Sequence, residues 1–402
     1  MIGAFKQTTS RFAIAAAAGL FTGGIALTPV QAASLGGDCC ADLEERVAEL
    51  EATTVRKGNR KVSVKLSGHV HRAILFWDDG EENDVYIVDS ETSNTRWRIT
   101  GSATISPGRT VGFRIENEQF IRDNSSKVNQ ANGGKPADTN DARYQDIWFK
   151  DQTLGKFSVG HGDTASNGTS EVDLSGTGIA NYSGLADVGG AFEFRTSTGA
   201  LSGITLGSAY SSNDGLSRDS RIRYDTPTLA GFTISTSYGQ DDKVDGALRF
   251  KKEWNSVRCA WAGGIAHDTN EENDDKWIYS TSGSCIHTPS GLNLTIAYSE
   301  TDEGTSDVDT QFFYIKAGIS RRWNSHGKTS ISVAYANNQD RVASVGNLID
   351  DELDSVSVAI LQKIDSAALE LYAVYTHHDY DDNTATSYQE LDFFTLGARI
   401  KF

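Results

Sequence analysis

The feature that most constrains this chain is a two-residue alternation of apolar and polar side chains, which starts near Lys61 and recurs to the C-terminus. In one such segment the apolar residues are Leu292, Leu294, Ile296 and Tyr298, and the intervening ones are Asn293, Thr295 and Ala297. A period of two places the two rows on opposite faces of a β-strand. The segments run about 9–14 residues, the length that a tilted strand needs to cross a bilayer. A chain this polar, with no long apolar helix after its N-terminal segment, can span a membrane only as a closed barrel.

The connections between the segments support this interpretation and give the number of strands. Pro107, Pro227 and Pro289 fall in short turns and Pro136 falls in a long connection, as expected because proline cannot donate to a strand ladder. Seven short turns alternate with eight longer, acidic loops, which is the asymmetry of bacterial barrels. The sequence therefore predicts an all-β fold, an antiparallel transmembrane barrel of sixteen strands over residues 61–402. A hairpin in the wall at Ala191–Tyr210 would raise the number to eighteen.

The N-terminus is typical of an export signal. Lys6 and Arg11 precede an apolar stretch, Phe12–Leu27, and Val30-Gln31-Ala32 is a small-residue cleavage site. We expect residues 1–32 to be a cleaved signal peptide, and a membrane anchor is the alternative. Cleavage would change the net charge from −17 to −19, because residues 1–32 hold two basic and no acidic residues. So acidic a chain argues against nucleic-acid binding, which requires a basic face.

A short helix is expected between the signal and the barrel, in a periplasmic segment that covers residues 33–60. Leu43, Val47 and Leu50 form one apolar stripe at helical spacing within residues 42–57. Such a helix can dock at the barrel rim or form a short trimeric coil, and the sequence does not separate the two. Cys39 and Cys40 are adjacent, so they pair with another subunit, with each other, or not at all.

The aromatic residues add two expectations. The last strand alternates and ends the chain on Phe402, a closing signature of outer-membrane barrels and unusual for a soluble β protein. Tryptophans are expected near the strand ends, in two interfacial girdles. The outer girdle would hold Trp77, Trp97 and Trp277, and the inner girdle Trp148, Trp254 and Trp323.

Four blocks of the sequence resemble the general porins of alphaproteobacteria, of the rhizobial type. They are residues 39–80, GHGDTASNGTSEVDLSGTG (160–178), GLSRDSRIRYDTPTLAGFTIS (215–235) and TLGARIKF (395–402). The resemblance implies a sixteen-stranded barrel in the outer membrane of a Gram-negative bacterium, a homotrimer, and one loop folded into the lumen. It implies a channel for passive diffusion of small hydrophilic solutes and ions.

The longest connection, about residues 163–217, follows the fifth expected strand, where porin-like proteins place the loop that narrows the channel. We expect acidic residues of this loop to face arginines of the first strands and to set up a transverse field across the pore. The acidic residues are Asp163, Glu171, Asp173 and Asp187, and the arginines are Arg72, Arg96, Arg98 and Arg114. Arg72 is assigned to the inward side of the first strand with the other arginines, although the alternation of that strand slips near Arg72–Phe76.

Two of the four cysteines are predicted to form a disulfide. A symmetric hairpin centred near residues 271–272 pairs Cys259 with Cys285. Directly opposed residues of an antiparallel pair can meet disulfide geometry, and the periplasm is oxidising.

Other functions are less well supported. A channel selective for one solute class uses the same architecture, and the acidity of the chain argues weakly against a phosphate channel. An outer-membrane enzyme or an adhesive protein is a further alternative, but no GxSxG nucleophile motif occurs and most loops are short. No cofactor or metal site is expected, apart from loosely bound Ca²⁺ or Mg²⁺ at acidic outer loops such as 268–275 and 378–383, which could bridge lipopolysaccharide phosphates. His377 and His378 are adjacent at an expected outer strand end, where they could touch a metal, but such a pair is more often only a titratable surface feature, and we interpret it so. We expect a mild preference for cations.

Overall fold

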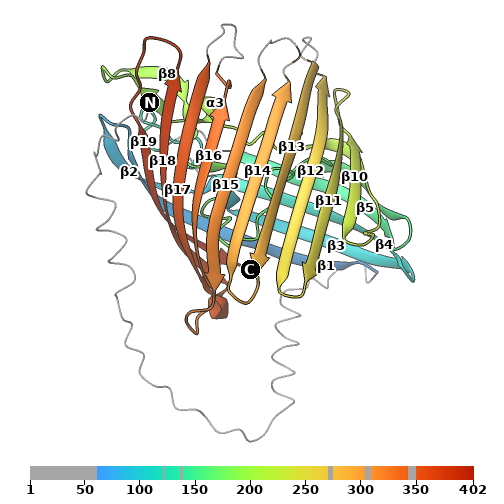
Figure 1. Cartoon of the computed structure of the whole chain (residues 1–402). Helices are drawn as coiled ribbons and strands as arrows, with labels where there is room; N and C mark the ends of the chain where they lie inside the picture. Colours follow the sequence, from blue (N-terminus) through green and yellow to red (C-terminus); the bar gives the residue numbers. More distant parts are fainter. Residues whose placement is uncertain are drawn as a thin grey trace, which may run out of the picture. The chain divides into compact units, whose positions relative to one another are not determined.

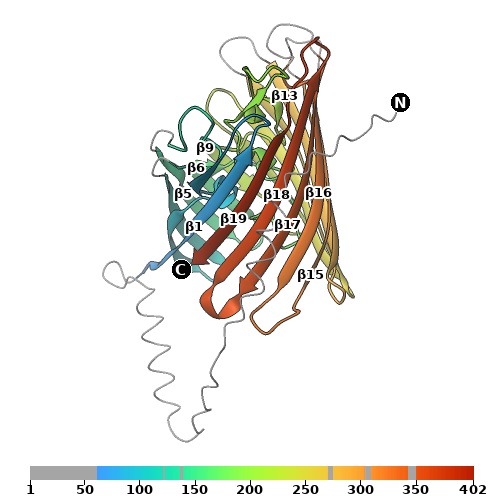
Figure 2. The same cartoon turned by 90° about the vertical axis from the view of Figure 1, so that its left-hand side faces the viewer.

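The described part of the chain forms a closed antiparallel barrel (Figures 1 and 2). The computed structural model describes residues 61–120, 123–135, 139–269, 275–302, 304, 309–342 and 350–402. The expected signal peptide, the expected periplasmic segment at 33–60 with its helix at 42–57, Cys39 and Cys40 lie outside the described residues.

Within the described residues, the elements follow one another as strands joined by turns, three short 3-10 segments and one short α-helix. The strands of the first half are β1 (Ser63–Asp78), β2 (Asn83–Asp89), β3 (Arg96–Ser106), β4 (Arg109–Phe120), β5 (Thr139–Asp151), β6 (Gly155–Asp163), β7 (Glu193–Arg195), β8 (Leu201–Thr205), β9 (Arg218–Asp225) and β10 (Phe232–Tyr238). Those of the second half are β11 (Val244–Trp254), β12 (Val257–Thr269), β13 (Asp275–His287), β14 (Leu292–Asp302), β15 (Thr310–Arg321), β16 (Thr329–Gln339), β17 (Asp351–Ile364), β18 (Leu369–Asp382) and β19 (Leu391–Lys401). The helical segments are η1 (Glu91–Ser93), η2 (Leu185–Asp187), α3 (Leu206–Ala209) and η4 (Asp365–Ala367). No helix in the described part of the chain is long and apolar enough to span a bilayer.

The wall has sixteen strands, as predicted. β2 and β3 both pair with β1, β2 along its second half and β3 along its first, so together they make one barrel strand interrupted at η1. The barrel closes where β1 pairs with β19, from His69 opposite Lys401 to Asp78 opposite Asp392. Two backbone hydrogen bonds between Gly68 and Phe402 extend this seam to the end of the chain. The eighteen-strand alternative is wrong, because β7 and β8 pair only with each other in a separate sheet.

Burial in the wall alternates along each strand as the sequence does, but the apolar residues are the exposed ones and the polar residues are the buried ones. On β14, the apolar residues Leu292 to Tyr298 are 39–59% exposed, whereas Asn293 to Ser299 on the other face are 0–7% exposed. A soluble protein buries the apolar row, but here that row forms the outer face, where the lipid is. The inner face carries small and polar side chains.

Two of the tryptophans expected in the girdles lie inside the barrel. Trp77 is buried among Tyr86 and Phe192, and Trp148 lies on the inward row of β5, between Tyr144 and Asp146 on one side and Lys150 on the other. Trp77 turns inward because the lumen on its side holds an apolar core, described below, rather than water. The girdle assignment is therefore wrong for these two residues.

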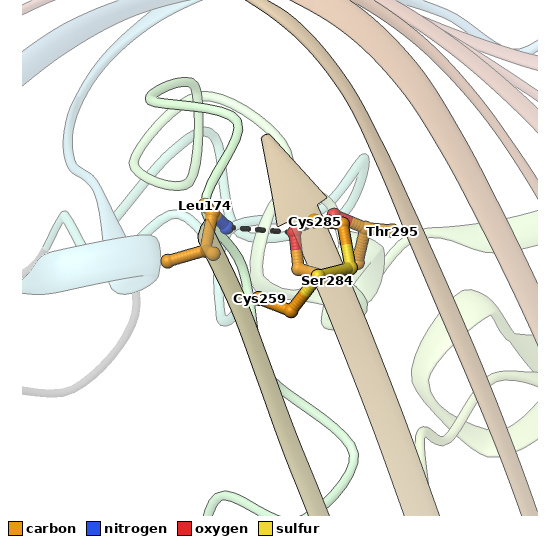
Figure 3. The surroundings of a disulfide bond; sticks show 5 residues. All are labelled: Leu174, Cys259, Ser284, Cys285 and Thr295. Atoms are coloured by element: carbon orange, nitrogen blue, oxygen red, sulfur yellow. Dashed lines mark hydrogen bonds between the residues drawn. A yellow bond between two sulfur atoms is a disulfide. The ribbon is translucent and has the colours of Figure 1, made fainter. Parts of the chain in front are cut away.

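The predicted disulfide is present. Cys259 on β12 and Cys285 on β13 are direct partners in the register and are joined by a bond of 2.03 Å between their sulfur atoms. Both lie on the outer face of the barrel, because their neighbour Ser284 points inward and bonds to Leu174 (Figure 3). The cross-link therefore lies on the side of the wall away from the lumen.

Replacing Cys259 and Cys285 together by serine is expected to lower the unfolding temperature without changing conductance. A cross-link between residues 26 positions apart restricts the unfolded chain by about 3 kcal/mol in the chain-entropy model. The measurement is the temperature at which the barrel unfolds in SDS, with single-channel current as the second readout. An altered conductance at unchanged heat resistance would contradict the outward placement.

Candidate channel constriction

Residues 164–217, here called the lumenal segment, leave the wall after β6 and return to it at β9. The segment runs along the inside of the barrel. The backbone N–H of Ser166 donates to Asp245 on β11 at 2.6 Å, and the N–H groups of Val172 and Leu174 donate to Ser282 and Ser284 on β13, both at 2.9 Å. These acceptors lie on the inward row, so the first part of the segment is bonded to the inner wall (Figure 3).

The segment continues past β16 and β17 and is accommodated by small wall residues. The Thr177 and Ser332 hydroxyls lie 2.8 Å apart, and Asn181 donates to Ser357 at 3.2 Å. The inward rows of the strands it crosses carry Ala262, Gly264, Ser280, Ser282, Ala334, Ser355 and Ala359, all but Gly264 buried. A Cβ on Gly264 would lie 3.0 Å from the Thr169 side chain, so larger residues would push the segment into the channel.

One buried lysine fixes the middle of the segment. The side chain of Lys316, on the inward row of β15, has no exposed surface. Its ammonium group donates to the Asp173 carboxylate at 2.7 Å and to the Asn181 carbonyl at 2.8 Å. A buried ammonium requires such partners, since it loses its hydration when enclosed. Lys316 therefore holds two points of the lumenal segment, Asp173 and Asn181, against the wall, and we call this pair of contacts the clamp.

Beyond this clamp the segment builds an apolar core inside the barrel. Phe192, Phe194, Leu206 and Tyr210 of the segment are buried. They contact inward side chains of strands from both ends of the chain, namely Leu75, Trp77, Tyr86, Val88, Phe312, Leu353, Tyr380, Leu391 and Phe393. The ring centroids of Phe192 lie 5.1 Å from Trp77 and 5.2 Å from Phe393. This part of the lumen is packed with side chains, so water and solutes are confined to the rest.

The β7–β8 hairpin ties the segment to the connections at the long-loop end of the barrel. Arg195 donates to Asp79 and to Glu82, both at 2.8 Å, in the turn between β1 and β2. Gln389, in the connection between β18 and β19, donates its backbone N–H to the Arg195 carbonyl at 2.7 Å. The hairpin is thus held from both sides of the β1–β19 seam.

Replacing Arg195 by alanine is expected to loosen the hairpin, because the Asp79 carboxylate is fully buried and would lose its charged partner. Hydrogen bonds to charged groups contribute about 1.5–3 kcal/mol, so exchange of the hairpin amides should speed up at least tenfold. Open-channel current noise should rise. Arg258→Ala is the matched control, since its ion pair with Glu253 is exposed and weak. Equal exchange in the two variants would show that Arg195 does not hold the hairpin.

Across the lumen, the predicted arginines of β3 and β4 lie on the inward rows. Arg96 and Arg98 both pair with Glu116, Arg96 at 3.3 Å. The Arg114 guanidinium lies 3.3 Å from the centre of the Tyr144 ring and 3.5 Å from the Asp146 carboxylate. The three arginines therefore lie on one inward charged face.

Four further arginines belong to this inward set and were not singled out from the sequence. They are Arg143, Arg221, Arg223 and Arg249. Arg221 donates to Asp146 at 2.9 Å and Arg249 to the Asn167 carbonyl at 2.6 Å. The signal was present, because Arg221 and Arg223 alternate with Ile222, which is 56% exposed on the outer face.

Arg72 does not join this face, so its inward placement is wrong. It lies between the buried residues His71 and Ala73, on the same row of β1 as Val70 and Ile74, which are 41–43% exposed. Its side chain pairs with Asp123 and, at 3.6 Å, with Asp89. The alternation does not slip in this strand.

The four predicted acidic residues have different surroundings. Asp163 accepts from the Tyr144 hydroxyl at 2.6 Å, and Asp173 is held by Lys316. Asp187 accepts from the Tyr182 hydroxyl, and burial raises the pKa of Asp187 to about 7, with the charge of Glu91 adding to the shift. Asp173 thus holds the segment in place as well as carrying charge, whereas Asp163 is the last residue of β6, just before the segment begins.

Glu171 differs because its side chain is exposed and forms no ion pair within the described residues. Its neighbour Val172 is bonded to the wall and Ser170 to Asp214, so the carboxylate points into the open lumen. Its position inside the barrel raises its pKa well above the usual range, and the charges of Asp214 and Asp187 add to the shift. Arg218 is the cation that acts on it most, without direct contact.

A closed barrel with an apolar outer face, a polar inner face and a segment folded into its lumen defines an outer-membrane channel. The model of the Gram-negative porin family matches residues 13–383. The chain therefore belongs to the Gram-negative porin family, and it forms a water-filled outer-membrane channel for passive diffusion of small hydrophilic solutes.

Solved structures with the same fold are distant in sequence. The anion-selective porin of Comamonas acidovorans has a TM-score of 0.57 and 14% identity, covering 85% of this chain and 100% of that one. OmpT, an outer membrane protein of Vibrio cholerae, has a TM-score of 0.55 and 14% identity, covering 86% and 99%. The outer membrane channel DcaP of Acinetobacter baumannii has a TM-score of 0.55 and 10% identity, covering 86% and 99%. Curated protein sequences gave no match.

Proposed function

We propose that solutes cross this porin between the lumenal segment and the arginine face, through a charged constriction with a mild preference for cations. The observation that carries the proposal is Glu171, an exposed carboxylate on a segment whose neighbouring backbone is bonded to the wall. Most inward arginines are already paired with carboxylates, as Arg98 is with Glu116 and Arg221 with Asp146. Glu171 has no ion-pair partner among the described residues, so its negative charge can act on passing ions.

Opposed charges on the two sides of the channel would create a transverse field. A dipolar solute can align in such a field, whereas an apolar one must displace ordered water. Arginine suits the basic side because its guanidinium keeps its charge in any environment. The constriction thus favours small hydrophilic solutes in general over one recognised ligand, and it requires no cofactor and no catalytic residue.

We further propose the alphaproteobacterial, rhizobial type of porin, exported by cleavage of residues 1–32 and assembled as a homotrimer among lipopolysaccharide. The four sequence blocks support the type, and an in-vitro folded OmpT of Vibrio cholerae is described in a trimer form. Ca²⁺ or Mg²⁺ at the acidic outer loops would bridge lipid phosphates. Chemical cross-linking of the purified protein to a band of three chains tests the assembly.

The channel is tested by single-channel current of the purified protein in a planar bilayer with KCl. We expect ohmic conductance that closes in steps of three, and a reversal potential in a salt gradient that shows mild cation preference. A folded, heat-modifiable barrel without conductance would contradict the channel pathway. Anion preference would contradict the role given to Glu171.

A further inference from the structure

The outer face of the β18–β19–β1 sheet carries three metal-ligating side chains near the long-loop end. His377 and Asp392 are direct partners in the register of β18 and β19, and Glu390 lies just before β19. One ligand atom from each of the three lies within 4.8 Å of the others. The neighbouring His378 points inward to Ser355, so the adjacent histidines do not act as a pair.

The Asp392 carboxylate is already oriented by two neighbours. Its Oδ1 atom accepts from the Tyr375 hydroxyl at 2.6 Å and lies 2.9 Å from Nδ1 of His377. Hydrogen bonds of this kind orient a metal-ligating carboxylate in known sites. Two of the three proposed ligands, His377 and Asp392, lie on paired strands, so the strand register holds them in place.

The surroundings of the three side chains are strongly negative. Asp78 on β1 faces Asp392 across the barrel seam. The charges that act most on the His377 ring are those of Asp392, Glu390 and Asp379, all carboxylates. Below the site the outer face is apolar, with Phe76 and Phe394 5.9 Å apart between ring centroids. A compact cation would offset this concentration of negative charge at the edge of the apolar band.

We propose that His377, Glu390 and Asp392 bind one divalent transition-metal ion, of which Zn²⁺ is the representative. An imidazole nitrogen with two carboxylates suits Zn²⁺, whereas Ca²⁺ and Mg²⁺ prefer oxygen ligands alone. The imidazole is what distinguishes this cluster from the acidic outer loops. Three protein ligands leave a coordination position open toward the outside of the barrel, for water or another oxygen donor.

The test is a titration of the untagged, folded protein in detergent with Zn²⁺. The heat of binding is measured by isothermal titration calorimetry in a buffer free of other metals. We expect one ion per chain, bound at least tenfold more tightly than Ca²⁺. His377→Ala and Asp392→Asn should each weaken Zn²⁺ binding at least tenfold. His287→Ala is the matched control, because His287 is exposed and Nδ1 of its ring lies 2.7 Å from the Ser290 hydroxyl, away from the three proposed ligands.

The outcomes separate the site from general acidity. Absence of Zn²⁺ binding, or binding that survives His377→Ala, overturns the proposal, as does equal affinity for Ca²⁺. Binding should also weaken as the pH falls, because the imidazole must be neutral to act as a ligand. Heat modifiability and conductance report whether each variant is folded, and Glu390→Gln, at an exposed position, repeats the test if His377→Ala fails to fold.

Discussion

Replacing Lys316 by methionine is expected to release the middle of the lumenal segment from the wall. The ammonium group is the only charged partner of Asp173 among the described residues and also holds the Asn181 carbonyl. Removing one partner of a buried ion pair costs about 3–5 kcal/mol, and Asp173 can recover part of this by hydration because it is partly exposed. We expect current noise to increase strongly and the amides of residues 172–181 to exchange at least tenfold faster.

The wall itself should keep its heat resistance in this variant, because the strand ladder does not depend on the clamp. Lys328→Met is the matched control, since Lys328 is exposed in a short turn. A double variant, Lys316→Met with Asp173→Asn, should recover part of the protection by removing the unpaired charge. An unchanged exchange rate in Lys316→Met would show that other contacts hold the segment.

Replacing Glu171 by lysine should turn the mild cation preference into an anion preference. A unit charge about 4 Å from a passing ion contributes about 1 kcal/mol in water. The change of two charges should therefore shift the ratio of cation to anion permeability by roughly fivefold or more. The permeability ratio is obtained from reversal potentials in a salt gradient at pH 8. The salt is kept dilute because salt screens the interaction between such charges.

The wild-type preference should itself depend on pH. A raised pKa means that Glu171 takes up its proton at a higher pH than an ordinary glutamate, so the cation preference should increase as the pH is raised and fall as the pH is lowered. Glu171→Gln should remove most of that dependence. Asp381→Lys, at the exposed outer end of β18, makes the same change of charge and should leave the permeability ratio nearly unchanged.

The wall could be predicted from the sequence because its signal is local. Alternation with a period of two, prolines confined to connections and the closing strand gave the sixteen strands and the Cys259–Cys285 pairing. Apolar residues facing lipid and small polar residues facing the segment are both properties of single strands. No knowledge of distant contacts was needed for this part of the fold.

The errors occur where a strand is apolar on both faces. Residues 73–77 (AILFW) gave no clear alternation, because Ala73, Leu75 and Trp77 pack on a core that includes Phe192 and Phe393, more than a hundred positions away. Arg72 and Trp77 were misplaced for this reason. Phe192 and Phe194 resembled a wall strand, since a buried hairpin inside the lumen has the same composition. Lys316 carried no signal at all, because its partners lie on the lumenal segment.

The apolar core inside the barrel also has a consequence for the order in which the barrel folds. Phe192, near the middle of the sequence, lies between Trp77 of the first strand and Phe393 of the last. The core is complete only once both β1 and β19 are in place. Pairing of these two strands and packing of the lumenal segment should therefore be one cooperative step during biogenesis. Trp77 emission would then report the moment of closure in a refolding experiment.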